Sequence, residues 1–317
     1  MQIASLATRH RHTLGLLLGV LGAVLFSAKA IVVKLAYRYG VDPETLLALR
    51  MFFALPFFLA IAYRQHQRAP ISLTRRQGLT LLAMGVLGYY AASYLDFLGL
   101  QYISAALERL ILFLYPTLVL LCAWLFFGRA VSPRQRWALL ISYLGIAATF
   151  AHDVQLAQPH LWLGAGLVLA SSVAYALYLL FGGELLQQIG VLRMTALASI
   201  IASLACIVQF LLMRELSVLQ LPWQVYALSI FNALFCTVLP VFFVMFSVKL
   251  LGSGIAAQVG MIGPISTLFF SASLLDEALT QWHLLGTGAV LLGIFLLNHK
   301  PVQARLLESQ NHNERTK

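Results

Sequence analysis

Apolar residues in this chain form long runs separated by short polar segments. Ten such runs of roughly 20 residues can be distinguished, each long enough as a helix to cross the hydrocarbon core of a bilayer. Their approximate limits are 13–37, 43–63, 77–98, 102–126, 134–152, 161–183, 191–213, 222–247, 252–275 and 279–298. The pattern predicts an all-α integral membrane protein with ten transmembrane helices.

The composition supports this prediction. Hydrophobic residues make up 61% of the 317 residues, charged residues make up 10%, and the mean hydropathy is +0.86, whereas soluble domains carry about 25% charged residues. The longest polar segments, Arg64 to Gln77 and His299 to Lys317, leave no room in this sequence for a soluble catalytic or sensory domain. The N-terminal apolar run and Ala28-Lys29-Ala30 imitate a cleaved signal peptide, but the internal repeat described below favours a retained first helix.

Lysine and arginine are distributed unequally between the two sides of the predicted bundle. When alternate loops are assigned to opposite sides, one side carries only Arg38 and Arg214. The other side carries Arg9, Arg11, Arg64, Arg68, Arg75, Arg76, Arg129, Arg134, Arg136, Arg193, Lys249, Lys300, Arg305, Arg315 and Lys317. The positive-inside bias predicts a cytoplasmic (inner) membrane protein with both termini in the cytoplasm. Basic loops beside anionic lipid headgroups account for the net charge of +10, so nucleic acid is not an expected partner.

An internal repeat relates the two halves of the chain. A shift of 148 residues aligns Pro116 with Pro264, and Leu144-Gly145-Ile146 with Leu292-Gly293-Ile294. Because this shift covers five spans, an odd number, the second half is expected to be inverted relative to the first, which is a common transporter design. The predicted segments are a cytoplasmic stretch 1–12, a first five-helix repeat 13–152, a second, inverted repeat 161–298 and a cytoplasmic tail 299–317.

Several local motifs give the chain a family resemblance. They are Leu49-Arg50 in the second span, 99–106 (GLQYISAA) entering the fourth, Tyr115-Pro116 at its middle, and Leu275-Asp276-Glu277 closing the ninth. With these motifs the chain resembles the drug/metabolite transporter superfamily, specifically its ten-helix EamA-type members, over residues 13–298. The resemblance implies two inverted five-helix repeats around a central cavity, cytoplasmic termini, and export or exchange of small metabolites by alternating access.

One loop departs from the family pattern. Gly128-Arg129 stands where a glutamate commonly follows the glycine, so the first repeat lacks that glutamate. The equivalent loop of the second repeat is Asp276-Glu277. Opposite charges are expected if these two loops face opposite sides of the membrane.

Five ionisable residues are predicted to lie at depth in the outer half of the first repeat, namely Lys29, Arg50, Asp96, Glu108 and Arg109. Each such charge costs about 2.5 to 3.5 kcal/mol on insertion scales, so pairing or a function is expected. One hypothesis is a structural network in which Arg50 pairs with Glu108 or Asp96, and Arg109 pairs with the other. The second is that one member faces the cavity, where Glu108 would exchange protons or an arginine would bind an anionic substrate group. Successive helical residues point about 100° apart, so Glu108 and Arg109 cannot face the same way.

Three further ionisable residues lie nearer the ends of their spans. Lys34 is expected to extend toward the outer headgroups. Glu184, near the cytoplasmic end of the sixth span, and His283, near the outer end of the tenth, are expected to be structural.

Tyrosines form stripes on two predicted helices. Tyr90 and Tyr94 share a face with Phe97 on the third span, and Tyr175 and Tyr178 make a shorter stripe on the sixth. These rings are either packing residues and interfacial anchors or a cavity wall that offers ring faces and hydroxyls to a substrate.

Prolines interrupt four spans, and two of them are equivalent in the repeat. Pro116 and Pro264 each remove a backbone hydrogen bond and predict paired kinks. The kinks are either gates that open alternately or incidental bends, because membrane helices tolerate proline.

Motifs of other protein classes were also considered. HExxH, GxSxG, a phosphate-binding glycine loop and a paired histidine or cysteine set are absent from the sequence. Cys122, Cys206 and Cys236 lie in apolar runs and suggest no disulfide, metal site or cofactor. An intramembrane enzyme, a channel or a receptor built on Glu108 and Arg109 are the alternatives, although a channel would need a symmetric ring of such groups.

The sequence therefore predicts a secondary transporter rather than an enzyme. Its substrate would be a small polar or amphipathic metabolite, such as an amino acid or a related compound, exported or exchanged by alternating access around a midplane cavity. The other expected partners are membrane lipids and, through Glu108, protons. The substrate, the coupling ion and the oligomeric state do not follow from the sequence.

Overall fold

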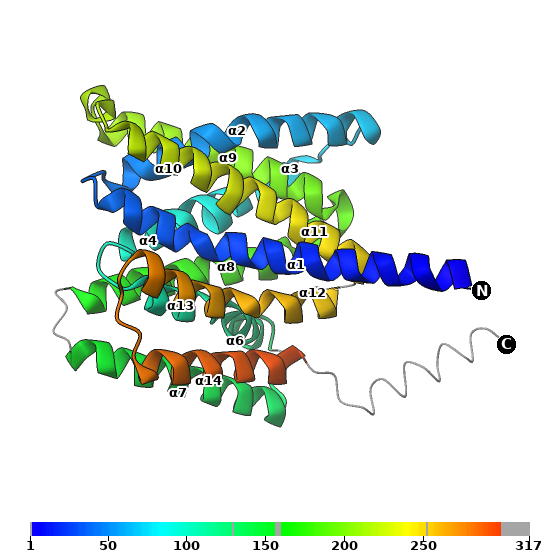
Figure 1. Ribbon diagram of the computed structural model, residues 1–317. Helices are drawn as coiled ribbons and strands as arrows, with labels where there is room; N and C mark the ends of the chain where they lie inside the picture. The colour runs from blue at the N-terminus through cyan, green and yellow to red at the C-terminus, as the bar shows by residue number, and fades with distance from the viewer. Residues whose placement is uncertain (1, 129, 156–159, 252, 299–317) are drawn as a thin grey trace.

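The polypeptide folds into a bundle of long helices (Figure 1). The structure is a computed structural model that describes residues 2–128, 130–155, 160–251 and 253–298, and it contains no strand within those ranges. Arg129 and the side chain of Glu184, both considered above, lie outside the described residues. The predicted all-α class is confirmed.

The helices follow the predicted apolar runs closely. In the first half they are α1 (Gln2–Tyr37), α2 (Pro43–Arg68), α3 (Arg75–Met84), η1 (Gly85–Ala91), α4 (Ala92–Gly99), α5 (Ala105–Leu112), α6 (Tyr115–Phe127) and α7 (Pro133–Gln155). In the second half they are α8 (Leu161–Ile189), α9 (Val191–Met213), η2 (Leu216–Leu219), α10 (Trp223–Ala233), η3 (Leu234–Val238), α11 (Leu239–Leu251), α12 (Ser253–Gly260), α13 (Ile262–Leu274) and α14 (Gln281–Asn298).

Length and composition qualify these helices as membrane spans. Among the described residues, 8 helical stretches are long and apolar enough to cross a bilayer, and two shorter apolar helices, Gln258–Leu274 and Gln281–Leu296, complete the set. Each of the ten apolar runs therefore corresponds to a helical stretch. The difference from the expectation is that spans three, four, eight and nine are interrupted rather than regular α-helices.

Two of the interruptions are π-helical turns at equivalent places in the two halves. The π-helix η1 lies in the third span and η3 lies in the eighth, and the repeat offset of 148 residues superimposes them. A π-turn inserts an extra residue into the helical ladder, and such turns are frequent at functional sites. Irregular backbone is therefore a shared property of both halves.

The other two interruptions have an evident cause in the prolines. A proline has no N–H, so the carbonyl four residues earlier loses its helical partner. Helix α5 ends at Leu112, four residues before Pro116, and α12 ends at Gly260, four residues before Pro264. The fourth and ninth spans are broken at equivalent points as a result.

The helix–helix contacts are also equivalent in the two halves of the chain. Helix α1 packs against α10, α11, α12 and α13, while its counterpart α8 packs against α3, α4, α5 and α6. The spans that are counterparts of each other also meet, because α2 packs on α9 and α7 packs on α14. Figure 1 shows α7 beside α14 along one edge of the bundle and α2 with α9 near the opposite edge. If each span is replaced by its counterpart in the other half, the main helix–helix contacts are therefore the same.

Glycines allow α4 and α8 to approach closely where α4 ends and α8 begins. A methyl group at Gly99 would lie 2.5 Å from the Val168 side chain and 2.9 Å from the Gly164 carbonyl oxygen. Since real methyl contacts in proteins do not occur at such distances, one of the helices would have to move. By contrast, the position of Gly166 on α8 has open space around it.

This contrast predicts different effects of two alanine substitutions. Gly99→Ala should lower the free energy of unfolding by about 1–3 kcal/mol, the usual cost of overpacking, whereas Gly166→Ala should leave it unchanged or raise it by up to about 1 kcal/mol, because alanine favours a helix interior more than glycine does. Thermal unfolding of the purified variants in the same detergent measures the difference. Equal melting temperatures for the two variants would contradict the close α4–α8 contact.

Candidate functional site

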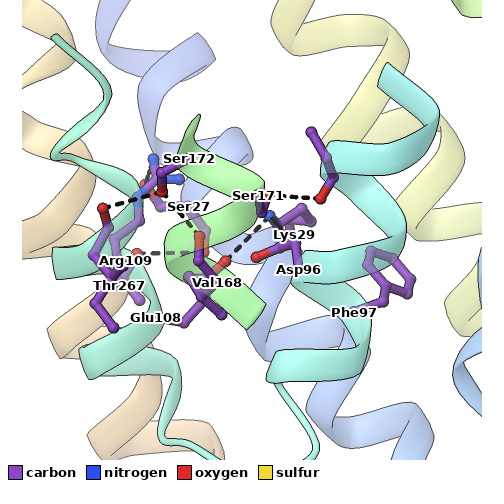
Figure 2. A network of polar contacts seen from close by, with 12 residues as sticks. Ser27, Lys29, Asp96, Phe97, Glu108, Arg109, Val168, Ser171, Ser172 and Thr267 are labelled. Carbon is purple, nitrogen blue, oxygen red and sulfur yellow. Dashed lines mark hydrogen bonds and ion pairs between the residues drawn. The ribbon is translucent and has the colours of Figure 1, made fainter. Parts of the chain in front are cut away.

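Three charged side chains from three helices meet inside the bundle (Figure 2). The ammonium of Lys29 on α1 contacts the carboxylate of Asp96 on α4 and lies 3.1 Å from Glu108 Oε1 on α5. The side chains of Asp96 and Glu108 are 3% and 0% exposed, and that of Lys29 is 14% exposed. Lys29, Asp96 and Glu108 are called the triad below.

The triad contains more acid than base. Lys29 carries one positive charge, whereas Asp96 and Glu108 carry two negative charges when both are ionised. Asp96 Oδ1 and both carboxylate oxygens of Glu108 lack a hydrogen bond among the described residues. A buried charge without a partner is strongly unfavourable. The arrangement is therefore balanced when the two carboxylates share one proton or when a cationic group joins them.

Local helix structure explains why Glu108 reaches the triad. The short helix α5 begins at Ala105, after Ser104, whose hydroxyl oxygen accepts a hydrogen bond of 3.1 Å from the amide of Leu107. From this start Glu108 turns toward Lys29, while the next residue, Arg109, turns toward Ser27 of α1. The two side chains diverge because successive residues on a helix point about 100° apart.

Arg109 is held by contacts with α1 and its own helix rather than by a carboxylate. Its Nη2 donates a hydrogen bond of 3.1 Å to Ser27 Oγ, and its guanidinium lies 4.9 Å from the centre of the Phe113 ring. Its Nε has no hydrogen-bond partner among the described residues. A side chain at Gly263 on α13 would come within 2.8 Å of Nη2, so glycine at that position makes room for the guanidinium.

Ser27 is a site residue that the sequence analysis missed. Its hydroxyl lies 2.8 Å from the carbonyl oxygen of Gly263, to which it can donate, and it accepts from Arg109. Thr267, one turn along α13, also donates to the Gly263 carbonyl at 3.3 Å. A small hydroxyl residue in an apolar run gives little signal by itself, because such residues commonly bond to the backbone of their own helix.

The pairing expected from the sequence is not the one observed. Within the described part of the chain, neither Arg50 nor Arg109 forms an ion pair with a carboxylate. Arg50 is 4% exposed and stacks 4.6 Å from the centre of the Phe97 ring. The expectation that the arginines pair with Asp96 and Glu108 is wrong because α1 packs close to α5 and places Lys29 between the two carboxylates.

The predicted tyrosine residues form two separate groups. Tyr90 and Tyr94 stack with ring centres 6.2 Å apart, and the Tyr94 hydroxyl donates a hydrogen bond of 2.9 Å to Glu44. Tyr175 and Tyr178 also stack, at 5.7 Å. The first stripe is thus tied to the start of α2 rather than to the triad.

The second group extends into a longer series of rings. Tyr175 meets Tyr115 edge to face at 5.4 Å, Tyr115 lies 6.5 Å from Phe113, and Tyr178 meets Tyr89 at 5.3 Å. Since Phe113 stacks on Arg109, the series connects the arginine to the π-helix η1 that contains Tyr89. Tyr89 and Tyr115 were not among the predicted site residues, and only the Tyr115-Pro116 motif pointed to one of them.

Lys34 also differs from its expected role. Its ammonium forms an ion pair of 3.1 Å with Glu277 and donates a hydrogen bond of 2.8 Å to the carbonyl oxygen of Ile103. Glu277 in turn accepts the amide hydrogen of Ala105 at the start of α5. A carboxylate is favoured there by the positive end of the helix dipole, and it draws Lys34 into the protein instead of toward lipid headgroups.

A further ion-pair cluster joins α2 and α9 at the same end of the bundle. Arg214 Nε lies 3.3 Å from Asp42, and its Nη2 lies 3.0 Å from Glu44. Burial raises the pKa of the Asp42 carboxyl, but hydrogen bonds from Thr45 and the charge of Arg214 outweigh burial and lower it below 3.8. The stabilisation from Asp42 is therefore present above its ordinary pKa and is lost as the pH falls through the lowered value.

Comparisons with known proteins agree with the architecture. The sequence model of the EamA-like transporter family matches residues 13–151 and again 162–299. The chain is 30% identical over 277 residues to a Bacillus subtilis protein named "Uncharacterized transporter YcbK", covering 86% of this chain and 88% of the relative. It is 25% identical over 317 residues to "Uncharacterized transporter sll1319" of Synechocystis, covering 91% and 94%. A solved structure described only as "Crystal structure of protein" superposes with a TM-score of 0.63 at 15% identity, covering 93% of this chain and 98% of the other, and thus shares the fold.

The triad predicts that Lys29 is more important for stability than Lys34. Lys29→Met should lower the free energy of unfolding by about 3–5 kcal/mol, because it leaves two buried carboxylates without their cation. Lys34→Met removes a partly exposed ion pair and should cost less than half as much. Thermal unfolding of both variants at neutral pH tests this order, and equal losses would contradict it.

Proposed function

The chain belongs to the EamA-like transporter family, and on that premise we propose that it is a secondary transporter of a small polar or amphipathic metabolite. An amino acid or a related compound is the proposed class of substrate. The proposed cycle is alternating access, in which the two five-helix halves, 13–152 and 161–298, rock about a site near the midplane.

The observation that carries the coupling mechanism is the triad, in which one ammonium serves two carboxylates. Such a group can change its charge by one unit without losing all its pairing, since Lys29 always retains one carboxylate. We assign proton binding to Glu108, which is fully buried and whose oxygens have the Lys29 ammonium nearby but no hydrogen-bond donor assigned among the described residues. Proton arrival at Glu108 would weaken its contact with Lys29 and free the helices α1 and α5 to separate.

Arg109 and the ring series beside it suit an amphipathic substrate. The guanidinium Nε of Arg109, which has no hydrogen-bond partner within the described ranges, offers a hydrogen bond to an anionic group. The rings of Phe113, Tyr115 and Tyr175 offer an apolar and partly polar wall next to it. This supports a role for Arg109 as the anion-binding residue and a role for Arg50 in packing against Phe97.

The interrupted helices support the proposed movement. The breaks before Pro116 and Pro264, and the π-turns η1 and η3, lie at equivalent positions of the two halves. Helices bend most readily at prolines and π-turns. Bending at one set of positions would open one side, and bending at the equivalent set would open the other.

The proposed setting is a cytoplasmic membrane with both termini in the cytoplasm and net transport outward. The distribution of lysine and arginine supports this orientation. The family and the names of the relatives favour a transporter over an enzyme or a channel.

Counterflow in proteoliposomes tests this function. Vesicles preloaded with a mixed pool of amino acids should exchange a labelled member in a saturable manner, and an imposed pH gradient should accelerate the exchange severalfold. Glu108→Gln should retain saturable exchange but lose the acceleration, whereas Glu215→Gln, which alters an exposed acid outside the triad, should behave like the unchanged protein.

The two parts of the proposal fail in different ways. Unchanged pH dependence in Glu108→Gln would remove Glu108 as the proton carrier while leaving transport intact. Non-saturable flux that rises linearly with solute would indicate a channel and contradict alternating access.

A further inference from the structure

A cavity of about 360 Å³ lies at the end of the bundle where Lys34 meets Glu277, and neither Lys29, Asp96 nor Glu108 lines it. Its walls are the segment 101–104 after α4 and the segment 277–279 before α14, and Asp153 and His283 also line it. Ligand cavities in proteins span roughly 300–1,000 Å³, so this one suits a small molecule.

Asp153 is a buried carboxylate that has no hydrogen-bond donor among the described residues. It comes from the last turn of α7, its exposure is 1%, and neither of its oxygens has a hydrogen bond among the described residues. Its nearest basic neighbour is His283 of α14, whose Nε2 lies 3.5 Å from Asp153 Oδ1. That distance is too long for a hydrogen bond of ordinary strength.

The other ring nitrogen of His283 faces Thr280 rather than Asp153. The backbone N–H of Thr280 points at His283 Nδ1 from 3.4 Å, and the Thr280 hydroxyl lies 2.9 Å from the same atom. His283 Nδ1 is thus engaged by Thr280, and neither Nε2 nor the Asp153 oxygens have a hydrogen bond among the described residues.

The charges around the cavity favour a cation. Lys34 and Glu277 form an ion pair with each other, while the buried carboxylate of Asp153 receives no hydrogen bond from the described residues. The described residues contain no cluster of three or more His, Cys, Asp or Glu side chains that could hold a metal ion. We propose that this cavity is a binding site for a small organic cation whose primary ammonium group donates hydrogen bonds to the carboxylate of Asp153.

The hydrogen-bonding groups of an ammonium match those that the Asp153 carboxylate can accept. An ammonium group has three donors and no acceptor, and the two oxygens of Asp153 have no donor among the residues that the structure describes. A side-chain amide at Gln101 and the partly buried ring of Tyr102 line the same cavity and can contact the rest of the molecule. The site is independent of the transport mechanism proposed above, because it shares no residue with the triad.

Equilibrium binding of ethanolamine tests the proposal. Isothermal titration of the full chain in lipid nanodiscs at neutral pH should give saturable binding of ethanolamine and none of acetate. Asp153→Asn should weaken binding by about tenfold to a hundredfold, since a hydrogen bond to a charged group contributes roughly 1.5–3 kcal/mol. Glu215→Gln removes an acid of the same charge at an exposed position and should bind like the unchanged protein.

A second variant tests the cavity without changing a buried residue, so that weaker binding cannot be attributed to misfolding. Ala278 is exposed and lines the cavity, so Ala278→Phe should obstruct it without disturbing the core and should also weaken binding. The proposal is overturned if folded, unchanged protein binds no ethanolamine, if Asp153→Asn binds it equally well, or if sodium competes at equal concentration.

The triad variant separates this inference from the proposed function. Glu108→Gln should bind ethanolamine normally even though its transport loses pH dependence. Loss of ethanolamine binding in Glu108→Gln would show that the ammonium binds at the triad and would overturn the assignment to Asp153.

Discussion

The interaction on which the structure depends most is the contact of one lysine with two carboxylates inside an apolar bundle. Lys29 joins α1 to α4 and α5, and each of these helices contributes one member of the triad. In a medium that hydrates charges poorly, the three side chains cannot separate without a large cost in free energy. In the proposed cycle, the helices that carry them would move together unless the charge of the triad changes, and proton binding is the proposed cause of that change.

The backbone of the two halves is alike, but their chemistry is not. The π-turns and the breaks before Pro116 and Pro264 recur at an offset of 148 residues. At the same offset Lys29, Asp96 and Glu108 are replaced by Leu177, Val244 and Ala256. The halves thus share the places at which helices bend, while only the first half carries the charged triad. Such a division suits a protein in which symmetric movements are controlled from one site.

The sequence predicted the helices well because apolar runs in membranes have few alternatives to helices. The seventh run, 191–213, is α9 with the same limits, and the prolines located the breaks in the fourth and ninth spans. The ionic contacts were predicted less well, because they depend on which helices pack together. Arg50 lies beside Phe97 instead of a carboxylate, and Lys34 meets Glu277 from a distant span. The π-turns have no recognisable pattern in the sequence.

A double-mutant cycle between Lys29→Met and Glu108→Gln, measured by unfolding in the same lipid or detergent, tests whether one ammonium stabilises both carboxylates. If it does, Glu108→Gln has little effect or is destabilising in the unchanged protein but is stabilising in the Lys29→Met background, where it removes an uncompensated charge. The coupling energy should then be about 1–3 kcal/mol, as found for residues in direct contact. Additive effects of the two substitutions would contradict the shared ammonium and, with it, the proposed control of movement by the triad.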